Sequence, residues 1–402
     1  MTWSGNWPDM AVLTPAQERQ HLQLLALAGF ASMASMRICD PMLVVLSDEF
    51  QVSTGDASAV VSTYAVVYGL SQLLYGPMGD RFGKLRVVSL AVLACAVISA
   101  ITALSNSLAM LVIMRGLMGA AAAGVIPLAM AWVGDRVPYE RRQETLAKIM
   151  SATVLGMMGG LWFGGFAADT LGWRAAFVVL SALFALAAVL LIRLLRVRTS
   201  PVSTRDAPGF WTSFRTTANL LAMARVRWVL GVTAAEGALV FGAMAFMPTH
   251  LHQHYGLSVM AAGSVMMLYG VGGLLYSQMA RHWLAWLGER GLARAGAGLV
   301  VAGLLGLAWG TATWMGLLAC LLAGLGFYML HNTLQVQATQ MAPAARGTAV
   351  TLFASSLFFG QSMGVLLMAK SVDMDWLAYA FSAAALGVVV LGRVVYRLVG
   401  KH

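Results

Sequence analysis

The feature that most constrains this chain is a series of twelve long apolar segments separated by short polar stretches. A helix needs about 20 predominantly apolar residues to span a bilayer. Only 10% of the residues are charged, against roughly 25% in a soluble domain, which excludes a soluble globule and a disordered chain. We therefore predict an all-α membrane protein with transmembrane helices at about 22–47, 57–79, 87–104, 108–134, 144–167, 173–195, 228–249, 259–280, 295–313, 315–340, 348–369 and 375–392.

The longest polar stretch within the chain follows the sixth apolar segment and divides the spans into two sets of six. It is rich in arginine and contains Pro201 and Pro208. Its later part interleaves aromatic and leucine residues with arginine, which fits either an amphipathic helix on the membrane surface or a partly ordered linker. The predicted parts are an N-terminal segment (1–21), a six-helix bundle (22–195), a linker (196–227), a second six-helix bundle (228–392) and a tail (393–402).

The positions of the basic residues indicate how the chain crosses the membrane. Of the 26 Lys and Arg residues, Arg37 and Arg115 lie within spans, and only Arg174 and Lys370 fall on one side. The other 22 fall on the side that also holds both termini, which the positive-inside rule assigns to the cytoplasm. The net charge of +10 is then explained by orientation against anionic lipid, and no nucleic-acid partner is needed.

An internal repeat with an offset of 200 residues relates the two sets of spans. The pair Gly160 and Gly164 maps onto Gly360 and Gly364, and a loop arginine recurs at the same offset. Two pseudo-symmetric six-helix halves are the architecture of many secondary transporters, whose substrate site lies near the membrane midplane between the halves.

The turn between the second and third spans carries the most specific motif, Gly76-Pro-Met-Gly-Asp80-Arg81-Phe-Gly83-Lys84-Leu-Arg86. We expect Gly76 to allow close helix packing and Gly83 to permit a tight turn. The motif resembles the loop signature of the major facilitator superfamily, G-x-x-x-D-R-x-G-R/K-x-R/K. A turn that only set topology would not need glycine and aspartate at these spacings. The resemblance implies a gate that holds the cytoplasmic side shut.

Spans 4 and 5 add to this resemblance. Arg115 is followed four residues later by a glycine, as in the family's pattern for span 4. Span 5 contains Gly156, Gly160, Gly164 and Gly165, similar to the family's antiporter-associated motif G-x-x-x-G-P-x-x-G-G, with leucine in place of the proline. The alternative for these glycines is close helix packing, which small residues at this spacing support in any membrane bundle.

Ionisable side chains inside spans are costly and are therefore functional candidates. Four qualify, Arg37, Asp40, Arg115 and Glu236. Arg37 and Asp40 are three residues apart, so they form either a self-neutralising pair or a site where Asp40 exchanges a proton. Glu236 maps by the repeat onto Met36, one turn from the level of Asp40, and has no cation within four residues on its own helix. We expect Glu236 to bind a proton or a cationic substrate.

Two groups of polar residues that contain histidine are further candidates. His331, Asn332 and Gln335 in span 10 could line a cavity, although an interhelical hydrogen bond is the simpler explanation. His250, His252 and His254 could form a metal site, but no fixed carboxylate or cysteine lies beside them in sequence. We predict no metal site and no cofactor.

The resemblance implies the bacterial drug and metabolite efflux branch of the superfamily. We expect a monomeric proton-coupled exporter of a small organic molecule in the bacterial inner membrane, working by alternating access. A proton symporter that imports a metabolite is the alternative, and a membrane enzyme or a non-transporting sensor is a more distant one. The chain contains no Walker, HExxH or Gly-x-Ser-x-Gly motif, so we expect no enzymatic activity.

Overall fold

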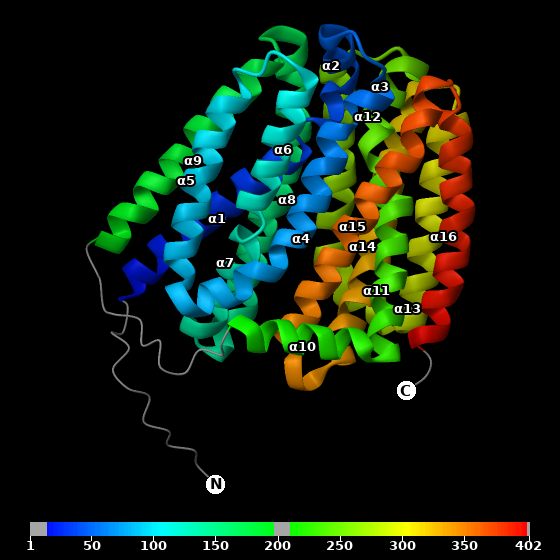
Figure 1. The fold of residues 1–402 in the computed structure, drawn as a ribbon. Helices are drawn as coiled ribbons and strands as arrows, with labels where there is room; N and C mark the ends of the chain where they lie inside the picture. The colour runs from blue at the N-terminus through cyan, green and yellow to red at the C-terminus, as the bar shows by residue number, and fades with distance from the viewer. Residues whose placement is uncertain (1–13, 197–209, 400–402) are drawn as a thin grey trace.

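The computed structural model describes residues 14–196 and 210–399, and almost all of this part is helical. The first group of helices occupies one side of the molecule in Figure 1, coloured blue to green. Its elements are α1 (Pro15–Arg37), η1 (Asp40–Met42), α2 (Leu43–Phe50), α3 (Thr54–Ala57), α4 (Ala59–Phe82), α5 (Lys84–Thr102), α6 (Leu108–Ala122), α7 (Val125–Arg136), α8 (Tyr139–Thr170) and α9 (Trp173–Arg196).

The second group occupies the other side, coloured green to red (Figure 1). Its elements are α10 (Phe210–Ala222), α11 (Ala224–Glu236), η2 (Gly237–Phe241), α12 (Gly242–Tyr255), α13 (Val259–Trp309), α14 (Thr313–Met341), η3 (Pro343–Ala345), α15 (Arg346–Asp373) and α16 (Leu377–Val399). α10 lies crosswise along the lower edge of the bundle (Figure 1), within the predicted linker. The first part of that linker, residues 197–209, lies outside the described residues.

Eleven helical stretches in the described residues are long and apolar enough to cross a membrane, against the twelve that the sequence predicts. The difference lies in α13, whose 51 residues are interrupted at Gly288 by a non-helical backbone (φ 65°, ψ 173°). Gly272 and Gly303 lie on opposite sides of this break, yet both pack against the same part of α14, residues 319–325. α13 is therefore a hairpin of two spans, and the predicted loop 281–294 is helical on both sides of Gly288.

Several predicted boundaries also shift because the helices extend beyond the apolar segments. α1 begins inside the predicted N-terminal segment, where Thr14 and Gln17 form a reciprocal capping box and Pro15 occupies the first helical position. The seventh span begins at Ala224 and not at residue 228. Polar helix ends of this kind carry no hydrophobic signal, so an apolar window places them too far inward.

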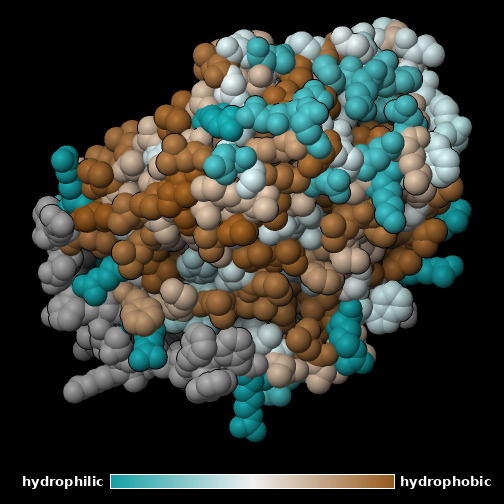
Figure 2. Space-filling view, turned by 45° about the horizontal axis from the view of Figure 1, so that its top comes forward, coloured by the Kyte–Doolittle hydropathy of each residue, from teal (hydrophilic) through white to brown (hydrophobic). Residues whose placement is uncertain are grey.

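The two groups of helices pack against each other through small residues and aromatic rings. The Tyr68 ring of α4 contacts the Phe358 ring of α15, with centroids 4.7 Å apart. Gly165 of α8 and Gly263 of α13 each lie against the backbone of the opposite helix. Outward-facing apolar side chains cover much of the visible wall (Figure 2), as expected for a surface in contact with lipid.

Candidate functional site

The first span is broken where its two charged residues lie. α1 ends at Arg37, and Pro41 occupies the single 3-10 turn that precedes α2. Proline lacks an N–H and clashes with the preceding turn, which explains the break. Arg37 Nη1 donates to Asp40 Oδ2 at 3.3 Å, and both side chains are fully buried. The predicted ion pair is therefore present, in a break and not on a continuous helix.

Glu236 lies at the matching place in the second half. It ends α11 and is followed by η2, a five-residue π-helical segment, before α12 begins. Isolated π turns interrupt the regular hydrogen-bond ladder and often occur at functional sites. Glu236 Oε2 lies 2.9 Å from Nδ1 of His331 on α14, and the glutamate is fully buried. The sequence identified both residues but did not pair them.

A continuous series of ring contacts connects the Arg37–Asp40 pair with the Glu236–His331 pair across the molecule. The Arg37 guanidinium lies 4.5 Å from the centroid of the Phe241 ring. Phe241 contacts Phe327 at 4.7 Å between centroids, and Phe327 stacks on His331 at 5.0 Å. The two pairs thus belong to one site between the two groups of helices.

Several buried polar atoms of this site have no hydrogen-bond partner among the described residues. They are Nε and Nη2 of Arg37, Oδ1 of Asp40, Oε1 of Glu236 and the hydroxyl of Tyr269. Tyr269 lies within electrostatic range of both Arg37 and Glu236. A buried polar atom without a partner is costly, and most such atoms are satisfied by protein, water or a ligand. The arrangement can therefore take up further polar partners.

Arg115 is buried at the same site but has a full set of acceptors. Its guanidinium donates to the backbone carbonyls of Val60 (3.2 Å), Ser35 (2.8 Å) and Met36 (3.3 Å), and it lies 4.2 Å from the centroid of the Tyr64 ring. Ser35 and Met36 belong to the last turn of α1, whose final carbonyls have no partner within the helix. Arg115 therefore binds the end of the broken first span.

The span-5 glycines bring α8 onto these same elements. A Cβ at Gly156, Gly160 or Gly164 would collide with the α1 backbone, and the last of these contacts is at Ile38, next to Arg37. Gly165 instead faces the backbone of α13. In the second half, Gly360 and Gly364 contact the backbone of Ala234 and Ala238, on either side of Glu236. The internal repeat thus places a helix with closely packed glycines, α8 or α15, against the irregular first span of each half.

The charged residues of the loop motif form their ion pairs within the first half. Gly83 has φ +89° and ends α4, as the predicted tight turn requires. Lys84 lies 3.7 Å from Asp80 and also pairs with Asp135 on α7. The prediction that Gly76 allows close helix packing is wrong, because nothing lies within 4 Å of a Cβ built there. Gly79 is the closely packed glycine of the motif, since its Cβ would meet Leu128. The neighbouring motif residues, Arg81 and Arg86, are exposed.

Most of the remaining polar candidates bind backbone carbonyls. Asn332 donates to the Tyr328 carbonyl, and Gln335 is half-buried. His250, His252 and His254 each contact a backbone carbonyl, of Leu307, Leu257 and Gly310 respectively. Among the described residues, no cluster of three or more His, Cys, Asp or Glu side chains could hold a metal ion.

Sequence reasoning missed two hydrogen bonds that join the halves. Asp373, at the end of α15, accepts from the backbone N–H of Gly55 at 2.8 Å. Asp169, at the end of α8, accepts from the backbone N–H of Met260 at 2.7 Å. The two acceptors lie 204 residues apart and the two donors 205, so the internal repeat was the signal that could have found them.

Comparisons with known proteins agree with this architecture. Residues 25–365 match the family described as the Major Facilitator Superfamily. An uncharacterized transporter of Escherichia coli O157:H7, YgaY, is 27% identical over 92% of this chain and 93% of its own length. The MFS-type transporter clz19 of Cochliobolus lunatus is 26% identical over 70% of this chain, which spans only 60% of that protein. Several curated relatives are likewise covered over less than two thirds of their length.

Solved structures show the same fold at low sequence identity. A crystal structure of the nucleoside transporter NupG (D323A mutant) matches with a TM-score of 0.78, 17% identity and coverage of 95% of this chain and 99% of that one. The human organic anion transporter MFSD10 matches with a TM-score of 0.72 and 19% identity, over 95% of this chain and 100% of its own.

Proposed function

This chain belongs to the Major Facilitator Superfamily, and on that premise we propose that it is a proton-coupled exporter of a small organic molecule that works by alternating access. The observation that supports the proposal is the central site, in which the buried Arg37–Asp40 pair and the Glu236–His331 pair are connected through two phenylalanine rings between the halves.

The charge balance of this site favours a proton or a cationic substrate. Arg115 donates to three backbone carbonyls and forms no ion pair among the described residues. Arg37 pairs with Asp40, so the partner of Glu236 is His331, and a proton on that pair or a bound cation supplies the local counter-charge that Glu236 otherwise lacks. Competition between a proton and a substrate for the same carboxylates is the basis of antiport.

The bonds between the halves support a two-state mechanism. Asp373–Gly55 and Asp169–Met260 both lie at the end of the bundle opposite the Asp80 loop. At the loop end, Asp80 and Lys84 pair within their own half. We infer a state closed at the external end, with the loop motif free to join the halves in the opposite state.

Transport into proteoliposomes under an imposed pH gradient tests the proposal. A panel of organic cations and neutral amphiphiles is offered outside vesicles with an acidic or an alkaline interior. Antiport predicts accumulation when the interior is acidic, because exiting protons drive substrate inward. Accumulation driven by an acidic exterior would indicate symport, and transport that ignores the pH gradient would contradict proton coupling. Empty vesicles under the same gradients control for passive trapping of weak bases.

A further inference from the structure

A cavity of about 520 Å³ lies outside the central site, between the later leg of α13 and α16. Three arginines line one part of it, and small or apolar residues line the rest. The lining is formed by Arg294, Ala297, Gly298 and Val301 of α13 and by Val389, Gly392, Arg393, Tyr396 and Arg397 of α16. The arginines lie at the end of the bundle that the positive-inside rule assigns to the cytoplasm.

The arginines of this cavity have no acidic partners among the described residues. The Arg294 guanidinium lies 4.5 Å from the centroid of the Tyr396 ring, on which it stacks. No carboxylate lines the cavity, and no ion pair of Arg294, Arg393 or Arg397 occurs among the described residues. Arg397 lies in the last turn of α16, where a positive charge complements the helix dipole, but Arg294 and Arg393 lie outside the terminal turns of their helices. Helix stabilisation therefore does not explain Arg294 and Arg393, which point to an anionic ligand.

The shape and place of the cavity identify the kind of anion. Guanidinium groups bind phosphate oxygens in a bidentate manner, and basic pockets between membrane helices hold anionic lipid head groups. Beyond the arginines the cavity is lined by Ala297, Gly298 and Val301, and nothing lies within 4 Å of a Cβ built at Gly298. A free phosphate would make no use of this apolar part, whereas an acyl chain fits it. We propose that this cavity binds an anionic phospholipid, with its phosphate on the arginines and an acyl chain along Gly298.

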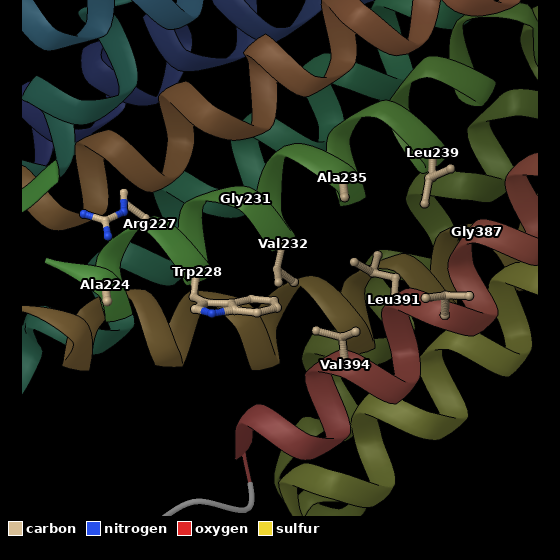
Figure 3. A pocket seen from close by; sticks show the side chains of 11 residues that line it. Ala224, Arg227, Trp228, Gly231, Val232, Ala235, Leu239, Gly387, Leu391 and Val394 are labelled. Carbon is tan, nitrogen blue, oxygen red and sulfur yellow. The ribbon is translucent and has the colours of Figure 1, made fainter. Parts of the chain in front are cut away.

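A neighbouring groove provides an internal comparison. It measures about 510 Å³ and lies between α11 and the other side of α16. Figure 3 shows Trp228 and Val232 facing Leu391 and Val394 across it, with Arg227 at one end. Nη1 of Arg227 already donates to the carbonyls of Leu221 and Ala222. This groove has a similar volume and apolar wall but only one arginine, which is already engaged, so it should not select anionic lipid.

Lipid binding to the purified full chain, measured by native mass spectrometry, tests the proposal. Delipidated protein is titrated with dioleoyl phosphatidylglycerol or dioleoyl phosphatidylcholine. The double variant Arg393→Gln/Arg397→Gln should lose about tenfold or more of its phosphatidylglycerol affinity, since each arginine near an anionic lipid surface contributes about 1 kcal/mol. Arg193→Gln/Arg215→Gln removes the same charge from exposed positions outside the cavity and should bind like the wild type.

A second pair of variants tests the acyl part without changing any charge. Gly298→Leu should fill the cavity and lower phosphatidylglycerol affinity, whereas Gly231→Leu fills the neighbouring groove and should not; neither position has an atom within 4 Å of the new Cβ. Equal affinity for both lipids, or equal effects of the two leucine variants, would overturn the proposal. Inorganic phosphate is the last probe: displacement of phosphatidylglycerol at equal concentration would show a site for soluble phosphate instead.

Discussion

Arg37 and Arg115 carry the same charge and are equally buried, but their surroundings give them different roles. Three backbone carbonyls accept from Arg115, so its charge is fixed to the end of α1. Arg37 has one carboxylate and a ring face, and two of its nitrogens have no partner among the described residues. Of the two, Arg37 is therefore the cation that can respond when the central site changes its protonation or its ligand.

The first prediction concerns Glu236, whose partner is His331. Glu236→Gln keeps the shape of the side chain but removes the negative charge, so the site can no longer exchange a proton there. We therefore expect pH-driven accumulation to fall to the level of empty vesicles. Substrate exchange down its own gradient should persist. Glu289→Gln, an exposed carboxyl on α13, is the control, and full pH-driven accumulation by Glu236→Gln would remove Glu236 from the coupling mechanism.

The second prediction concerns the Arg37–Asp40 pair. Asp40→Asn leaves Arg37 buried without a counter-charge, and breaking a buried pair on one side costs about 3–5 kcal/mol. We expect a low yield of folded protein and a lower unfolding temperature, measured by fluorescence-detected size exclusion and thermal unfolding. The double change Arg37→Ala/Asp40→Ala removes both charges and should recover part of this loss. A double variant that is no more stable than the single one would show that Asp40 does not stabilise the fold through Arg37.

At the scale of elements, the two halves form matching contacts at the end of the bundle opposite the Asp80 loop. α8 and α15 each end in an aspartate that accepts from a backbone N–H near the start of a span in the other half. The glycines of the same two helices contact the irregular first span of each half, at α1 in the first half and at α11 and η2 in the second. α8 and α15 therefore connect these aspartate contacts to the two central pairs through continuous helix.

The third prediction follows from these paired contacts. Asp169→Asn and Asp373→Asn keep an acceptor but lose the charge, which weakens each hydrogen bond by about 1 kcal/mol. The double variant should shift the equilibrium toward the externally open state by about tenfold or more. Distances between spin labels at the external ends of the two halves, measured by pulsed electron paramagnetic resonance, report this shift. Asp48→Asn, an exposed carboxylate at the same end, is the control, and an unchanged distance distribution in the double variant would contradict the assignment.

At the scale of the whole molecule, alternating access requires that the two ends are closed in turn. In this structure Asp80 pairs with Lys84 inside its own half, while Asp169 and Asp373 join the halves at the opposite end. The loop motif and the two aspartates should therefore stabilise opposite states of the same equilibrium.

The fourth prediction uses this opposition. Asp80→Asn should slow transport by about tenfold while substrate affinity changes little, because the residue stabilises one state and does not line the central site. The same spin-label pairs should report a population shift opposite to that of Asp169→Asn/Asp373→Asn. Combining the three changes should partly restore the wild-type distribution. Wild-type transport rates in Asp80→Asn would remove its role in gating.

The sequence alone determined the membrane-spanning character, the series of spans and the local Arg37–Asp40 pair, because these depend on residues close together in the chain. Tertiary structure decided that Glu236 pairs with His331, 95 residues away, and that Arg115 binds carbonyls 79 and 80 residues away. It also decided that α13 turns at Gly288 within helical sequence. Hydrophobic periodicity shows which faces are buried but not which faces meet. Partners across a bundle are fixed by the packing of small residues, such as Gly164 against Ile38, and that packing exists only when the whole chain is folded.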